Sequence, residues 1–192
     1  MYFKLWNGEF ADGDFNALAA LLGLLDTELK TINTQIKQSA DPDSDGLCDR
    51  GEYFIGVGFA GIQRYIASTY RTLGIEQGAA LALPPFVKNQ TTAVRALHAG
   101  ANYWKHQDEW NLTHVVFREV ENLKENAKST IKTIEEITPW AEYTCSNLLA
   151  ELLHLDNSIN DKNLLLTPLL DILGDWRINL DAFHRHIKRQ QG

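Results

Sequence analysis

Apolar residues recur at helical spacing through most of the chain, and no stretch shows the strict alternation of a half-buried strand. The long stretches with this pattern cover residues 15–36, 53–73, 92–108 and 115–137, and shorter ones cover 140–152 and 169–187. The segment between the second and third stretches holds two prolines and no steady period, as expected of a partly buried connection. The pattern predicts one all-α domain over residues 1–192, a helical bundle of roughly five to seven helices.

Local signals set the expected ends of these helices. Asp14 is expected to cap the first helix, and Gly74 to end the second. The pairs Thr138-Pro139 and Thr167-Pro168 each place a capping residue before a proline, so we expect a new helix to begin at each pair. The helix over 115–137 is expected to break once, near Ser129.

The segment between the first two long stretches reads DPDSDGLCDRGE and is strongly acidic. Counted from its first residue, carboxylates stand at places one, three, five, nine and twelve, with glycine at place six. This order resembles the calcium loop of EF-hand proteins, whose hard oxygen ligands have the same spacing. The resemblance implies a calcium shell from five side chains and the backbone carbonyl of place seven. These ligands would be Asp41, Asp43, Asp45, Leu47, Asp49 and Glu52.

Two features of the chain limit the role of such a loop. No second loop of this kind occurs with which it could pair, and the only methionine is Met1, so a sensor that opens a methionine-lined groove is not expected. We therefore expect structural calcium that clamps the two flanking helices, with magnesium as the lesser candidate. The alternative interpretation is a solvated turn rich in Asp and Gly.

Composition narrows the classes of partner. The 192 residues carry a formal net charge of −7 and a sequence pI near 5.3, which argues against nucleic-acid binding through the overall field of the protein and leaves a local basic patch open. No sequence feature indicates DNA. The two cysteines, Cys48 and Cys145, are too few for a disulfide framework. Without a signal peptide pattern or an apolar run of bilayer length, we expect a cytoplasmic protein and no membrane partner.

The third long stretch has an unusual polar face. Separations of three, four and four residues bring Arg95, His98, Asn102 and His106 to one side of a helix. These residue types can bind phosphate and transfer protons, so they are the candidate catalytic or RNA-binding residues. The alternative is that the two histidines and the amide are satisfied structural groups.

The end of this stretch, ANYWKHQDEW, resembles the second half of the motif in HEPN domains, which are helical bundles that cleave or bind RNA. The resemblance carries over Asn102 and His106, with Lys105 beside them, and implies a metal-independent endoribonuclease or an RNA-binding protein. Ala101 stands where the family has its catalytic arginine. Arg95 would have to supply the guanidinium, either by reaching along the helix or from a partner chain.

Two functions therefore follow from the sequence. The first is a calcium-stabilised helical bundle that binds RNA, or cleaves it with a degenerate HEPN-like motif. The alternative is a noncatalytic calcium-binding interaction or regulatory module, with a protein partner or a second copy of the chain docked on its helices. The position of the polar side chains discriminates between them: a shared solvent-facing cleft favours RNA, and burial of each with a local partner favours structure.

Overall fold

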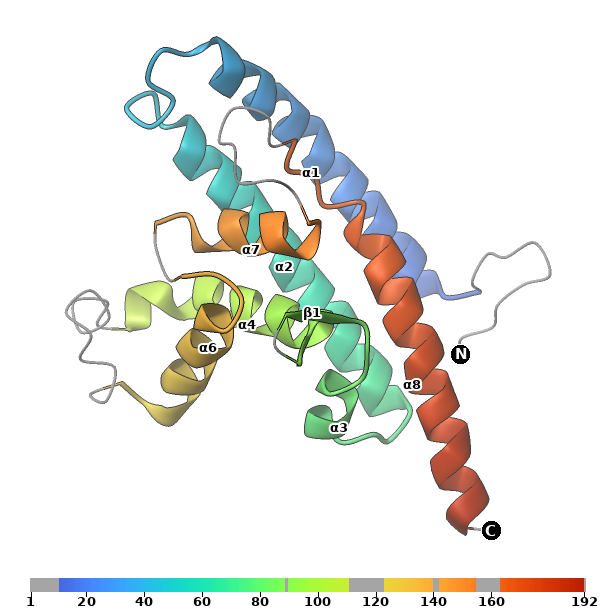
Figure 1. Ribbon diagram of the computed structural model, residues 1–192. Helices are drawn as coiled ribbons and strands as arrows, with labels where there is room; N and C mark the ends of the chain where they lie inside the picture. Colours follow the sequence, from blue (N-terminus) through green and yellow to red (C-terminus); the bar gives the residue numbers. More distant parts are fainter. Residues whose placement is uncertain (1–10, 89, 111–122, 140–141, 155–162, 192) are drawn as a thin grey trace.

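A computed structural model describes residues 11–88, 90–110, 123–139, 142–154 and 163–191. Within these ranges the chain is all-α apart from one small pair of strands, as the apolar spacing predicts (Figure 1). The seven α-helices described are α1 (Gly13–Gln38), α2 (Leu47–Thr72), α3 (Gln77–Leu81), α4 (Ala93–His106), α6 (Glu125–Glu135), α7 (Thr144–Leu152) and α8 (Leu169–Gln191). The 3₁₀ helix η1 (Gln107–Glu109) extends α4, and β1 (Phe86–Lys88) pairs antiparallel with β2 (Thr91–Thr92).

Helices α1 and α2 follow each other in the chain and form an antiparallel pair, joined at one end by the acidic loop (Figure 1). Helices α4 and α7 lie across α2, and α6 packs on α4. Helix α8 runs antiparallel to α1, because Asp26 in α1 binds Leu166 just before α8, whereas Arg177 in α8 lies 3.8 Å from Asp12 just before α1. Helix α2 is thus the central element of the bundle.

Capping side chains and one left-handed residue set several helix ends. Asp12, not Asp14, caps α1, because its Oδ1 accepts a hydrogen bond of 3.1 Å from the Phe15 N–H. Asp14 instead lies in the first turn, where its negative charge interacts favourably with the helix dipole. Gly74 ends α2 with a φ of 67°, and the next N–H, of Ile75, donates to the Tyr70 carbonyl at 3.0 Å. The expected end at Gly74 is confirmed.

Two other expected helix starts are wrong or displaced. Helix α7 begins at Thr144 and not at the pair 138–139, because Thr138 is buried and its N–H still donates to Ile134 at the end of α6. Helix α8 begins one residue after Pro168, and the Thr167 hydroxyl donates to Asp26 at 2.6 Å.

The break expected near Ser129 does not occur, since α6 is continuous through this residue. Residues 111–122, where the longer helix of this stretch was expected to begin, lie outside the described residues.

The core forms where the apolar stripes of the helices meet. On α8 the predicted inward residues Leu169, Leu173, Trp176 and Leu180 are fully buried. The Trp176 indole N–H donates to the Ala80 carbonyl at 2.9 Å, which ties α8 to α3. Within the ranges described, no helix combines the length and the apolar character needed to cross a bilayer.

Glycines let the helices approach one another closely. A Cβ at Gly56 of α2 would overlap the indole of Trp104 from α4. A Cβ at Gly58 would lie 2.5 Å from the Leu166 side chain, and one at Gly100 would lie 2.7 Å from the ring of Phe59. Each glycine therefore receives one large side chain of a neighbouring segment.

Candidate functional site

A cleft of 430 Å³ opens between α2 and α4 beside α3, and we call it the α2–α4 cleft. Its polar lining residues are Gln63, Arg64, Tyr70, Arg71, Gln77, His98, Asn102 and Lys105. No aspartate or glutamate is among the lining residues within the described part of the chain. The cleft therefore concentrates positive charge and amide groups within a chain of net charge −7.

A chain of hydrogen bonds crosses the α2–α4 cleft. The Lys105 ammonium donates to Oε1 of Gln63 at 2.5 Å. Nε2 of Gln63 donates to Oδ1 of Asn102 at 2.8 Å, and Nδ2 of Asn102 lies 3.3 Å from Nδ1 of His98. An ammonium group only donates, so it fixes the direction of every bond that follows.

This direction determines the tautomer of His98. Because Nδ2 of Asn102 is a donor, Nδ1 of His98 has to accept, and the ring proton sits on Nε2. Oε1 of Gln77 accepts from the Tyr70 hydroxyl at 3.2 Å, and Nε2 of Gln77 lies 3.2 Å from Nε2 of His98. Two N–H donors therefore face each other at this contact, so the Gln77 amide does not accept the Nε2–H of neutral His98.

The pKa values of the two basic groups agree with this arrangement. Burial lowers the pKa of His98, and the nearby positive charge of Lys105 lowers it further. Burial also lowers the pKa of Lys105. The cleft therefore favours a neutral imidazole next to a cation.

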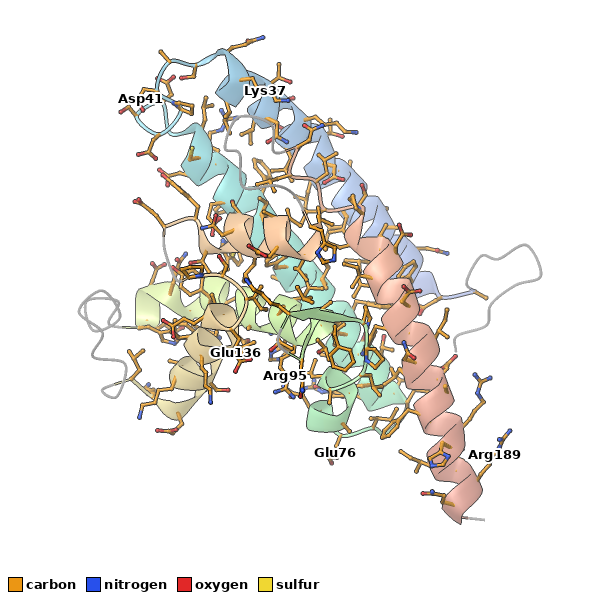
Figure 2. The ribbon with its side chains drawn as sticks, in the orientation of Figure 1. Lys37, Asp41, Glu76, Arg95, Glu136 and Arg189 are labelled. Carbon is orange, nitrogen blue, oxygen red and sulfur yellow. The ribbon has the colours of Figure 1, made fainter. Side chains whose placement is uncertain are left out.

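The structure brings together only part of the predicted polar face. His98 and Asn102 lie in the α2–α4 cleft. Arg95 is exposed on α4 and is not among the lining residues (Figure 2). Nδ1 of His106 lies 3.2 Å from the Glu109 carboxylate, and its ring stacks on Trp110 with centroids 6.4 Å apart. His106 thus faces its own chain neighbours, outside the cleft.

Several cleft residues had no signal in the sequence. Gln63, Arg64 and Arg71 come from α2, a stretch that the sequence predicts only to be a helix. Gln63 lies 39 residues before Asn102 in the chain, so no local spacing relates the two. Lys105 stands next to the candidate residues in the sequence. Its place in the chain of hydrogen bonds depends on Gln63 and could not be predicted from that position.

The backbone of the acidic loop, residues 41–52, has the sharp bend that the predicted calcium site requires. Gly46 at place six takes a φ of 67° and a ψ of 17°, which allows the sharp bend. The very next residue, Leu47, is the first residue of α2. Its carbonyl is therefore placed to accept a hydrogen bond within the helix.

Three of the four aspartates of the loop accept hydrogen bonds from protein groups. Asp41 accepts from the Ser44 hydroxyl at 2.7 Å and from its N–H at 3.2 Å, and these bonds lower the pKa of Asp41. Asp45 accepts from the Ser39 hydroxyl at 2.6 Å. The Tyr143 hydroxyl donates to Asp43, which raises the pKa of that phenol.

Glu52, the predicted bidentate ligand, binds the N-terminus of α7. Its carboxylate accepts from the N–H of Cys145 at 2.7 Å, the N–H of Ser146 at 2.8 Å and the Ser146 hydroxyl at 2.7 Å. Backbone N–H groups at a helix N-terminus have no partner within the helix, so a carboxylate there is stabilising. Its proximity also raises the pKa of the buried Cys145 thiol, which burial alone already raises.

The described side chains give the predicted calcium site no support. Among the described residues, no three His, Cys, Asp or Glu side chains are placed to hold one metal ion. Asp41 lies at the loop end of the α1–α2 pair, far from Arg95 on α4 (Figure 2). Calcium at residues 41–52 stays a prediction, and the loop is distant from that part of the polar helix.

Comparison with models of protein families, with curated proteins and with solved structures finds no match to this chain. The resemblances to HEPN domains and to EF-hand loops therefore stay predictions from the sequence.

Proposed function

We propose that the protein binds RNA, with the α2–α4 cleft as the site that receives the phosphate backbone. The observation that carries this proposal is the charge of the cleft: Arg64, Arg71 and Lys105 line it in an acidic chain, and the described lining residues include no carboxylate. Neutralised phosphates are the main source of affinity in RNA binding, and arginine binds phosphate in a planar, two-pronged geometry. The HEPN-like sequence around Asn102 supports RNA as the source of the phosphate.

The proposed role is binding without cleavage. A metal-independent ribonuclease needs a histidine that exchanges protons with the reacting oxygen atoms. His106, the histidine of the resemblance, pairs with Glu109 outside the cleft. His98 lies inside the cleft, but its accepting nitrogen, Nδ1, is already bound by the Asn102 amide. The chain of hydrogen bonds instead holds Lys105 and Asn102 in fixed positions.

Fluorescence anisotropy with a short labelled single-stranded RNA tests the proposal. At low salt we expect binding by the wild type and a clear loss for Lys105→Ala and Arg71→Ala. Each lost phosphate contact lowers the slope of log affinity against log salt by about 0.7. Lys30→Ala, which removes an exposed cation on α1, is the matched control and leaves both affinity and slope unchanged.

Two results would contradict the proposal. If the wild type does not bind RNA at low salt, or if the cleft variants bind as well as the control, the cleft is not the RNA site. Incubation with the same RNA tests the second part: cleavage by the wild type that is lost in His106→Ala would show an active nuclease.

A further inference from the structure

A second cavity lies near the C-terminal end of α4, and we call it the aromatic pocket. It has a volume of 260 Å³ and is formed by the start of α2, the end of α4 and the residues at the start of α7. Four aromatic side chains line it, from Tyr53, Tyr103, Trp104 and Tyr143. Its size is just below that of pockets for drug-sized ligands, so it suits a small molecule.

The packing of α4 on α2 fixes the rings of this pocket. The Trp104 indole occupies the space that Gly56 leaves open, since any Cβ there would overlap it. Tyr53 meets Trp104 edge to face, with ring centroids 5.6 Å apart and an interplanar angle of 74°. Tyr53 is nevertheless 60% exposed, so much of its surface is available to a ligand.

The charge of the aromatic pocket is negative. The carboxylates of Asp49, Glu52 and Glu142 line it, and among the described residues that line it there is no lysine, arginine or histidine. Glu52 is committed to the N-terminus of α7, so the exposed Asp49 and Glu142 supply the negative charge. Aromatic rings with a negative face and nearby carboxylates together favour a cation.

We propose that the aromatic pocket binds a small molecule with a quaternary ammonium group. Such a cation has no N–H to satisfy and is weakly hydrated for its size, so aromatic rings replace water around it at little cost. A hard metal ion would require several converging oxygen ligands, which the described residues do not place together. The carboxylates disfavour a ligand that also carries a negative charge, such as a betaine.

This inference does not depend on the proposed RNA site. The α2–α4 cleft and the aromatic pocket share no lining residue, and their charges are opposite. Substitutions in one site therefore leave the other intact.

Calorimetric titration with choline, in a buffer that contains a metal chelator, tests the inference. We expect measurable binding of choline and at least about tenfold weaker binding of 3,3-dimethylbutan-1-ol, a neutral molecule of the same shape. Tyr53→Leu removes the ring from the pocket and weakens choline binding by about tenfold, whereas Tyr53→Phe keeps the ring and the affinity. Asp49→Asn, at an exposed position, also weakens it.

Three outcomes would overturn the inference. These are the absence of choline binding at millimolar concentrations, equal binding of choline and its neutral analogue, and equal affinity of the wild type and Tyr53→Leu. Melting curves of each variant show that the fold persists, which is expected because Tyr53 and Asp49 are exposed.

Discussion

The substitution Glu52→Gln distinguishes two roles of this carboxylate, as a cap of the N-terminus of α7 and as a predicted ligand of calcium. In the structure, Glu52 on α2 accepts three hydrogen bonds from Cys145 and Ser146 and so holds the start of α7. Glutamine has the same shape, but only one of its two terminal atoms accepts. Its amino group would face a backbone N–H, and the favourable charge at the helix N-terminus would be lost.

The expected cost is about 2 kcal/mol of unfolding free energy, because hydrogen bonds to charged groups contribute roughly 1.5–3 kcal/mol and part of the interaction remains. For a chain of this length, that loss lowers the melting temperature by about 4–8 °C. Thermal unfolding followed by circular dichroism, with calcium or with a chelator, measures it.

The effect of calcium on the melting temperatures decides between the two roles of Glu52. If Glu52 caps α7, its substitution destabilises the protein equally with calcium and with chelator. The control Asp49→Asn changes the melting temperature little in either buffer, since Asp49 is exposed. A calcium shell predicts the opposite: the wild type melts higher with calcium, and Asp41→Ala, Asp49→Asn and Glu52→Gln each abolish that difference. Unchanged melting of Glu52→Gln in chelator would refute the capping role.

The other predictions concern a buried carboxylate and a histidine. Asp26 is 2% exposed and accepts from two N–H groups and a hydroxyl, so Asp26→Ala should cost about 3 kcal/mol or more in urea unfolding. Glu28→Ala, at an exposed position on the same helix, should cost little. Lys105→Met should raise the pKa of His98 toward its ordinary value in an NMR titration of the ring, because a nearby positive charge is removed. An unchanged or lower pKa of His98 would contradict the electrostatic effect of Lys105 on the ring. Because the folded pKa of His98 is lowered, the unfolded chain takes up the proton first as the pH falls. Stability is therefore full above about pH 6.5 and declines below it, and His98→Gln should decline less.

The long helices could be predicted because their apolar spacing is a property of each segment alone. The fully buried positions of α8 follow that spacing, and so does the half-buried ring of Phe183. Helix ends were less predictable where tertiary contacts decide them. Thr138 has the local sequence of a cap, yet burial and a hydrogen bond to Ile134 keep it at the end of α6.

The candidate site could be predicted only in part, for the same reason. His98 and Asn102 lie one helical turn apart, so their common face follows from the sequence. Gln63 and Arg71 reach the cleft from another helix, and only the crossing of α2 and α4 brings them there. Likewise, the partner of Glu52 lies 93 residues further along the chain. The spacing of the acidic loop, in contrast, carries no information about α7.

The glycines at the helix crossings also bear on how the chain selects one arrangement of its helices. Gly56, Gly58 and Gly100 each leave room for one particular ring or branched side chain. Sliding α4 by one helical turn, about 5.4 Å, would move the Trp104 indole out of the space that Gly56 leaves open. Misdocked registers are therefore penalised sterically, before the polar contacts of either pocket form. In this chain, small residues specify the topology, and large ones supply most of the stability.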